Sequence, residues 1–307
     1  MKCSKCSREA VYFQRHANRF LCSRHFVEDF ERRVKFAVNR FGMIERGDRI
    51  AIALSGGKDS VTLTYVLNKL YGFRRDLEFV AITIDEGIEG YRPHTVEIAR
   101  KVCRELNVEH VVVSFVENFG MTLDEMVKRG EKKPCTYCGV FRKYLLNRTA
   151  RELGATKLAT GHNLDDETQT ILLNFLNADI ERLARLVPQR RQEGLVIRIK
   201  PFREVYEKEV VVYGLLHGLP LTFDECPYSS FPVRAAVRDF LYEFERKYPG
   251  RKFSVLRSFE KLIPCLQNLY PQIELNRCER CGEPTPRRVC QACRLLEELK
   301  ERDLDID

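Results

Sequence analysis

The chain has 307 residues, of which 44% are hydrophobic and 31% are charged. That length predicts about two domains, and that composition excludes a disordered or collagen-like chain. Lys and Arg exceed Asp and Glu by 52 − 44 = 8, which favours phosphate-rich partners. No apolar stretch approaches the roughly 18 residues of a membrane span, and the N-terminus has no apolar signal region. We therefore expect a cytoplasmic protein that does not associate with a membrane.

Twelve cysteines are the most informative feature of the composition, because thiols in a reducing compartment usually hold metals or do chemistry. Eight ligand-type residues form two sets with zinc-ribbon or knuckle spacing, one near each end of the chain. Each set offers four ligands for a tetrahedral zinc ion, which predicts two closed structural zinc sites. No coordination position is left open for a catalytic water. The sets are Cys3, Cys6, Cys22 and His25, and Cys278, Cys281, Cys290 and Cys293.

Strand and helix patterns alternate between the two cysteine sets. Strands are expected at 49–54, 78–84, 110–115 and 156–160, and helices at 58–71, 94–107, 140–153 and 165–177. This alternation predicts an α/β fold with a Rossmann-like parallel sheet that is covered on both faces. Ligands bind such sheets beyond the carboxyl ends of the strands, so the loops after strands one, two and four are candidate sites.

The loop after the first expected strand is suited to an anion. Its glycines let backbone N–H groups point at a phosphate, and the following helix adds a positive end. A Walker A loop is excluded because Ile52 occupies the first glycine position and Asp59 replaces the hydroxyl residue after the lysine. A helix-capping turn is the alternative, but capping alone requires neither the glycines nor the lysine. The loop consists of Ser55, Gly56, Gly57, Lys58, Asp59 and Ser60.

Three inner cysteines form a further candidate site. Cys135 and Cys138 lie just before an expected helix, where thiol pKa values are depressed, and Cys226 lies far downstream. These cysteines have three alternative interpretations, which are a redox disulfide, a third zinc site and an iron–sulfur cluster. We favour the cluster because no fourth zinc ligand is evident near Cys226, whereas a cubane accepts three thiolates and leaves one iron open. The two remaining cysteines, Cys103 and Cys265, are expected to be buried small hydrophobes.

Several segments together resemble one family. These are SGGKDS at 55–60, DEGIEGYR at 85–92, PCTYCGV at 134–140, TGHNLDDE at 160–167 and ECPY at 225–228. With the terminal cysteine sets, they resemble the tRNA 2-thiouridine synthases of the PP-loop ATPase superfamily over nearly the whole chain. The IDEGIEGYR, CTYCGVFR and VCQAC segments are most similar to the NcsA branch, which acts at the wobble uridine (position 34). The TtuA branch, which thiolates the T-loop uridine (position 54), shares GHNLDD and the N-terminal C-x-x-H.

The resemblance implies an adenine nucleotide alpha hydrolase-like fold and a reaction in two steps. The uridine 2-carbonyl attacks the α-phosphate of ATP, and sulfur from a 4Fe–4S cluster on the inner cysteines then displaces AMP. The implied partners are tRNA and a sulfur donor (a ubiquitin-like thiocarboxylate protein or sulfide), and the implied state is a homodimer. Asp59 and Asp166 would hold Mg²⁺ and the phosphates. The other implied nucleotide contacts are Ala53, Ile84 and Gly161.

Arg142 stands where the TtuA branch has a lysine. Arginine can still clamp a phosphate, but a role that needs proton loss would be absent. In the pair that follows Leu164, we expect Asp165 to cap the helix and Asp166 to be the functional acid.

The expected organisation is an N-terminal zinc finger (1–30), a PP-loop catalytic domain (31–230), a helical segment (231–275) and a C-terminal zinc ribbon with its tail (276–307). Basic residues concentrate in 182–203, 234–257 and 277–294, which predicts a surface that tracks the phosphates of folded RNA. The acidic tail after Leu296 is expected to be an exposed helix end.

Two alternative functions would account for some of these features. One is a zinc-ribbon RNA-binding protein whose loop binds nucleotide as a switch. The other is a PP-loop amidotransferase or lysidine-type synthetase. Neither has a use for Cys135, Cys138 and Cys226.

Overall fold

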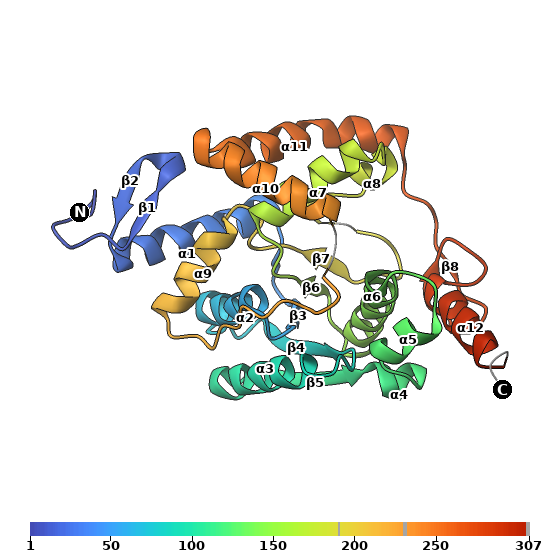
Figure 1. The fold of residues 1–307 in the computed structure, drawn as a ribbon. Helices are drawn as coiled ribbons and strands as arrows, with labels where there is room; N and C mark the ends of the chain where they lie inside the picture. The colour runs from blue at the N-terminus through green and yellow to red at the C-terminus, as the bar shows by residue number, and fades with distance from the viewer. Residues whose placement is uncertain (190, 230–231, 305–307) are drawn as a thin grey trace.

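A computed structural model describes residues 1–189, 191–229 and 232–304 of the chain. Its centre is a five-stranded parallel sheet in the order β5-β4-β3-β6-β7 (Figure 1). The predicted α/β parallel sheet is therefore confirmed, and the edge strand β7 is an addition to the four strands expected. The strands are β3 (Arg49–Ala53), β4 (Glu78–Asp85), β5 (Glu109–Ser114), β6 (Lys157–Ala159) and β7 (Ile197–Ile199).

Helices cover both faces of this sheet because its strands are apolar on both sides. On β3, Ala51 packs into the core that contains Phe141 of α6, whereas Ile50 and Ile52 pack into the core that contains Phe30 of α1. The principal helices are α1 (Ser23–Arg40), α2 (Lys58–Tyr71), α3 (Arg92–Leu106), α6 (Pro134–Glu152), α7 (Leu164–Leu176) and α9 (Glu207–Leu216).

Shorter and peripheral elements complete the chain. They are β1 (Tyr12–Gln14), β2 (Arg19–Leu21), α4 (Phe115–Phe119), α5 (Leu123–Arg129), α8 (Ile180–Ala184), α10 (Pro232–Lys247), α11 (Arg251–Leu269), β8 (Asn276–Arg277), β9 (Pro284–Thr285) and α12 (Gln291–Leu304), with a 3₁₀ turn at Arg15–Ala17. Helices α7, α8, α10 and α11 lie together along one side of the molecule (Figure 1). Among the described residues, no helix has both the length and the apolar character to span a bilayer.

The strand order reverses next to β3. The chain runs from β3 to β4 and β5 on one side, and then returns to place β6 and β7 on the other side. The loops that follow β3 and β6 therefore meet at the carboxyl edge of the sheet. A side chain at Gly161, after β6, would place its Cβ only 3.1 Å from the backbone carbon of Asp59, so the glycine permits this close approach.

Helix α6 begins earlier than the sequence pattern indicated. Pro134 occupies its first turn, where the fixed φ of proline suits a helix and its missing N–H is not needed. Cys135 and Cys138 therefore lie inside the helix rather than before it, so the expected start at residue 140 is wrong.

The N-terminal hairpin of β1 and β2 is attached to the body by buried charges. The Asp29 carboxylate, on α1, accepts hydrogen bonds from Gln14 at 2.9 Å and Arg19 at 2.6 Å. Arg33 pairs with both Asp29 and Glu209, the latter on α9. Burial works against the charge of Asp29, but these cationic and amide donors hold the pKa of its carboxyl well below the usual range.

The C-terminal segment shares its core with α6. The segment after Leu296 is the end of helix α12, as expected, but Leu299 is 1% exposed and belongs to the apolar cluster of Tyr137 and Phe141, so the expected exposure is wrong there. Arg151, near the end of α6, donates to Glu283 beside β9 at 3.0 Å. Residues 305–307 lie outside the described part of the chain.

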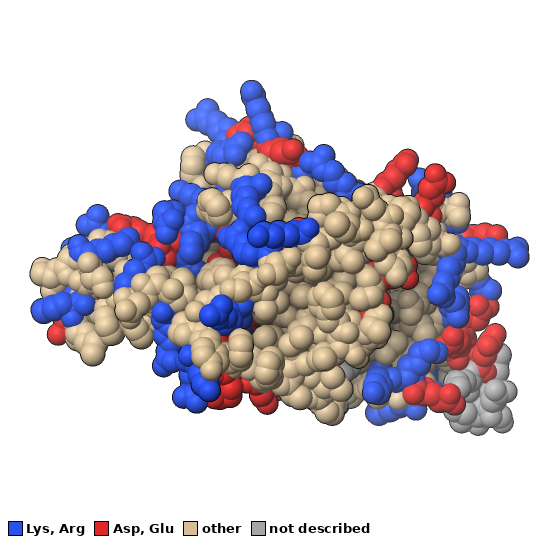
Figure 2. All heavy atoms as spheres, turned by 90° about the horizontal axis from the view of Figure 1, so that it is seen from above, with Lys and Arg blue, Asp and Glu red and all other residues tan. Residues whose placement is uncertain are grey.

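The basic run at 182–203 is not a continuous surface. Arg203 is fully buried, pairs with Glu260 at 2.7 Å, and so cannot contact RNA phosphates. Lys200 pairs with Glu167 at 2.5 Å, and Arg190 lies outside the described residues. Figure 2 shows cations projecting around the periphery of one face, whereas a broad central area carries few charges.

The two scattered cysteines differ in their surroundings. Cys103 is 3% exposed, as expected for a small buried hydrophobe. Cys265, on α11, is exposed, so the same expectation is wrong there.

The conformation of Gly56 predicts a large effect of substitution. Its φ is +84°, and an added Cβ would lie 1.9 Å from the Thr95 carbonyl oxygen. Gly56→Ala should therefore lower the free energy of unfolding by at least about 2 kcal/mol in urea denaturation. Gly57→Ala is the matched control, because φ there is −78° and the nearest atom is 3.6 Å away. Its cost should stay below about 1 kcal/mol; equal losses in the two variants would contradict the interpretation.

Candidate active site and metal sites

The loop after β3 presents the uncapped start of α2. Gly57 is the N-cap of this helix and no side chain caps it, so the alternative of a capping turn built on Ser55 is wrong. The Ser60 hydroxyl donates to the Gly57 carbonyl at 3.0 Å and accepts from the Ser55 N–H at 3.1 Å. Ser60 therefore shapes the loop, while the first N–H groups of α2 remain suited to an anion.

The acids of the two adjoining loops are held together by Asn163. This residue caps α7, because its Oδ1 accepts from the N–H groups of Asp165 and Asp166 at 3.0 and 3.2 Å. Its Nδ2 donates to Asp59 at 3.3 Å, and its N–H donates to Asp166 at 3.1 Å. Sequence reasoning missed Asn163, although an asparagine three residues before an aspartate is a recognisable capping pattern.

Asp165 has a different role from the one expected. It does not cap α7; its carboxylate accepts from the Glu207 N–H at 2.8 Å and pairs with Lys252 of α11. The expectation of a cap failed because the preceding asparagine already satisfies the helix N–H groups.

Burial and repulsion between carboxylates disfavour the ionised forms of Asp59 and Asp166. Burial, with the neighbouring charges of Asp59, Glu207 and Asp165, raises the pKa of Asp166 to about 7. Burial likewise raises the pKa of Asp59. Carboxylate oxygens are ligands that Mg²⁺ prefers, and a cation would offset the repulsion between them, so these residues fit the ion that the nucleotide-binding loop implies.

Two buried residues link this loop to α6, and sequence reasoning had not identified them as linking residues. Arg92 is 3% exposed and donates to the carbonyls of Ser55, at 2.9 Å, and Ile84. Its Nε lies 2.7 Å from Glu86, and the other oxygen of Glu86 lies 3.8 Å from Arg142. Ile84 is 4% exposed and Ala53 is half-buried, and their contact with adenosine stays a prediction.

The inner cysteines share one neighbourhood at the start of α6. Cys135 Sγ donates to the Tyr228 carbonyl at 3.4 Å, which brings the segment of Cys226 against the helix. Cys138 and Cys226 both pack on the core that contains Tyr137. Burial raises the pKa of Cys135, and that of Cys138 to about 11, so the predicted depression is wrong for the unliganded thiols.

The spacing of these thiols suits a cluster better than a single ion. In the described residues, only the two terminal sets bring their ligand atoms within 4.8 Å of one another. One zinc ion holds thiolates at about 2.3 Å, which requires such close sulfurs, whereas an iron–sulfur cube separates its ligands more widely. Because the three inner cysteines do not form such a close group, a single tetrahedral zinc ion is disfavoured there, and three thiolates are a donor set that an iron–sulfur cluster accepts.

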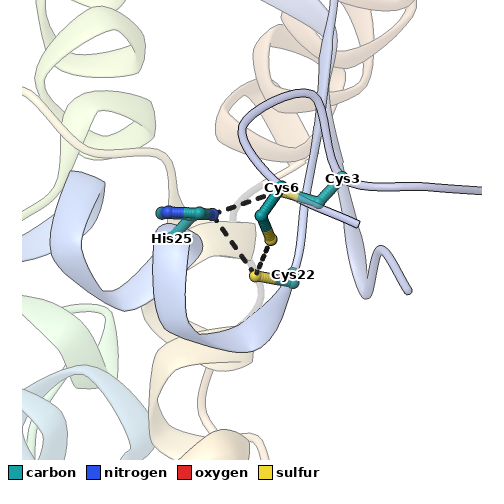
Figure 3. A group of neighbouring side chains, drawn as sticks. All are labelled: Cys3, Cys6, Cys22 and His25. Carbon is teal, nitrogen blue, oxygen red and sulfur yellow. Dashed lines mark hydrogen bonds between the residues drawn. The ribbon is translucent and has the colours of Figure 1, made fainter. Parts of the chain in front are cut away.

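The terminal sets have the geometry of closed tetrahedral sites. Figure 3 shows the N-terminal side chains converging, with Cys6 and Cys22 sulfurs 3.8 Å apart and His25 Nδ1 3.3 Å from Cys3. In the C-terminal set, the Cys278–Cys293 and Cys281–Cys290 separations are 3.9 and 3.7 Å. These distances match ligands placed around one zinc ion.

Backbone donors prepare one thiol in each terminal set for metal binding. Burial opposes the thiolate charge, but N–H groups, including that of Lys5, lower the pKa of Cys3 to about 6. The Cys290 N–H, at 3.2 Å, contributes to the same effect at Cys278, whose pKa is also about 6.

Family models and relatives agree with this geometry. A PP-loop domain model matches residues 26–244, and the N-terminal LIM domain model of the 2-thiouridine synthetase TtuA matches residues 2–27. The tRNA 2-thiolation protein NcsA of Haloferax volcanii is 40% identical, with 98% of this chain and 99% of that protein covered. The tRNA-5-methyluridine(54) 2-sulfurtransferase of Pyrococcus horikoshii is 36% identical, with 98% and 95% covered.

A solved structure extends the similarity to three dimensions. The U34-tRNA thiolase NcsA of Methanococcus maripaludis, with its 4Fe–4S cluster, superimposes with a TM-score of 0.86 at 34% identity. The match covers 97% of this chain and 96% of that one. The nucleotide loop, the acids beside it and the cysteine sets thus occur in a chain that belongs to the family of PP-loop tRNA 2-thiouridine synthases.

Proposed function

We propose that this protein is an ATP-dependent tRNA uridine 2-sulfurtransferase that acts at the wobble uridine. The observation that carries the proposal is the chain of contacts from Arg92 through Glu86 to Arg142. It joins the nucleotide-type loop to the helix that bears Cys135 and Cys138, which supports a site where an activated base and a sulfur source would meet at one sheet edge.

The residues divide the work of the first step. The α2 N–H groups and Lys58 would hold phosphates, while Asp59 and Asp166 would hold Mg²⁺. The uracil 2-oxygen attacks the α-phosphate and pyrophosphate leaves, with the developing charge stabilised by these fixed groups. Arg142 adds a permanent positive charge beside the inner cysteines, because a guanidinium does not lose its proton.

Cys135, Cys138 and Cys226 would hold a 4Fe–4S cluster, and this group would present sulfide from the donor to the adenylated base as AMP leaves. Two zinc ions fill the terminal sets as structural ions. We further propose a homodimer in the cytoplasm, with a ubiquitin-like thiocarboxylate protein or sulfide as sulfur donor. The cytoplasmic placement follows relatives named cytoplasmic tRNA 2-thiolation protein 1, such as that of Caenorhabditis elegans at 36% identity.

A T-loop uridine is the second candidate substrate. The Pyrococcus horikoshii relative is named for position 54, and the N-terminal LIM match belongs to the TtuA family model. The wobble position is favoured by the Methanococcus maripaludis relative, which is named a U34-tRNA thiolase. Mapping of thionucleosides in tRNA from a deletion strain should show loss of 2-thiouridine at position 34; loss at position 54 alone would reverse the assignment.

The acid pair provides the test of the ATP step. Asp59→Asn and Asp166→Asn keep the size of the side chain and one acceptor oxygen but remove the charges that would hold Mg²⁺. Both should lower tRNA-dependent pyrophosphate release by at least about 100-fold and leave tRNA affinity unchanged. Asp239→Asn, on the exposed side of α10, is the charge-matched control. Normal pyrophosphate release in either loop variant would overturn the mechanism, and tRNA binding without any release in the wild type would favour the nucleotide switch.

The inner cysteines provide the test of the cluster. Cys135→Ser, Cys138→Ser or Cys226→Ser should remove iron and sulfide from anaerobically purified protein but leave two zinc ions per chain. Cys265→Ser is the matched control, because that cysteine is exposed and outside all three sets. Metal analysis together with the visible absorption of the cluster measures both effects. Iron-free wild-type protein that still thiolates uridine would contradict the proposal.

A further inference from the structure

Lys58 is not free in the nucleotide loop. Its Nζ lies 2.7 Å from Asp59 Oδ2 and 2.7 Å from Glu207 Oε1. Burial works against the ammonium charge, but these two carboxylates raise the pKa of Lys58 above its usual range. The lysine that would hold phosphate is therefore already neutralised by the protein. Asp59 belongs to the same loop, whereas Glu207 comes from the first turn of α9.

Glu207 is held at its backbone from α7. Its N–H donates to Asp165 Oδ2 at 2.8 Å, and the other oxygen of Asp165 pairs with Lys252 of α11. Lys252 is 5% exposed, so this pair is shielded from solvent. The start of α9 is thus fixed to two neighbouring helices by a buried ion pair.

The residue before Glu207 adds a second anchor. Tyr206 donates its hydroxyl proton to Glu245 of α10 at 2.6 Å. Helix α9 also packs tightly on α2, since an added Cβ at Gly214 would lie 2.9 Å from the hydroxyl oxygen of Thr62. The Glu207 backbone therefore keeps its place relative to the loop, whereas the Lys58 side chain is long enough to change partners.

A phosphate that enters the loop must compete with Glu207 for Lys58. The ammonium has three N–H donors, and two are already directed at carboxylates. Glu207 also repels an incoming anion, and like charges at this distance oppose binding. Removal of its charge would therefore strengthen the hold of the loop on phosphate.

We propose that Glu207 is a positioning residue that competes with phosphate for Lys58, weakens the retention of pyrophosphate and returns the lysine to its resting place after each turnover. This inference rests on the proposed ATP-dependent function and assigns a residue to the release of its product. It also gives the helical pair α10 and α11 a role at the nucleotide loop, because both helices anchor the start of α9.

The test uses the full-length, cluster-loaded protein and inorganic pyrophosphate with Mg²⁺ as the probe. Glu207→Gln keeps the shape and hydrogen-bonding capacity of the side chain but removes its charge. Isothermal titration calorimetry should show pyrophosphate bound about fivefold more tightly than by the wild type, the size expected for a partly exposed ion pair. The inhibition constant of pyrophosphate should fall by the same factor. Glu207→Asp, which restores the charge, should return the affinity toward the wild-type value.

Controls separate this inference from the proposed function. Glu243→Gln makes the same charge change at an exposed pair on α10 and should leave pyrophosphate affinity unaltered. Wild-type protein that binds neither ATP nor pyrophosphate would refute the ATP step itself. If the wild type binds both and Glu207→Gln binds pyrophosphate equally or more weakly, the proposed competition alone is refuted.

Discussion

Two helices begin side by side at the carboxyl edge of the sheet, and the backbone contact between them constrains the rest of the site. Gly161 favours it, because a Cβ there would lie 3.1 Å from the backbone carbon of Asp59, closer than an ordinary contact. Asn163 then spans the gap with hydrogen bonds to Asp59 and Asp166. The fold thereby brings two half-buried carboxylates near each other. Burial raises the pKa of both, the charge of Asp59 adds to the effect at Asp166, and such a pair suits a cation.

Lysines from different helices pair with the carboxylates of this region and partly offset their negative charge. Lys58 pairs with both Asp59 and Glu207, while Lys252 pairs with Asp165. These ion pairs reach from the nucleotide loop to α11, so the helical segment after residue 231 contributes to the electrostatics of the site. The pair between Lys252 and Asp165 is largely shielded from solvent, whereas the pairs of Lys58 are partly exposed, and residues from four helices take part in the array.

The sulfur side of the site depends on a different part of the fold. The cysteine-bearing helix α6 packs Tyr137 and Phe141 against the core that also contains Leu295 and Leu299 of α12. The C-terminal ribbon is joined to the same helix by the pair between Arg151 and Glu283. The ribbon thus supports the helix that carries Cys135 and Cys138, in addition to any role in RNA binding.

The sequence by itself determined the parallel α/β sheet, the phosphate-type loop and both terminal ligand sets, because each depends on residues close together in the chain. It also indicated the inner cysteines as a set, although not that Cys135 and Cys138 lie within α6. Tertiary structure decided the partners of the charged residues. Ion pairs join Glu207 to Lys58 and Asp165 to Lys252, in segments far apart in the chain, and packing buries Arg203. Burial also reversed the expected thiol pKa shift, since desolvation depends on packing that local spacing does not reveal.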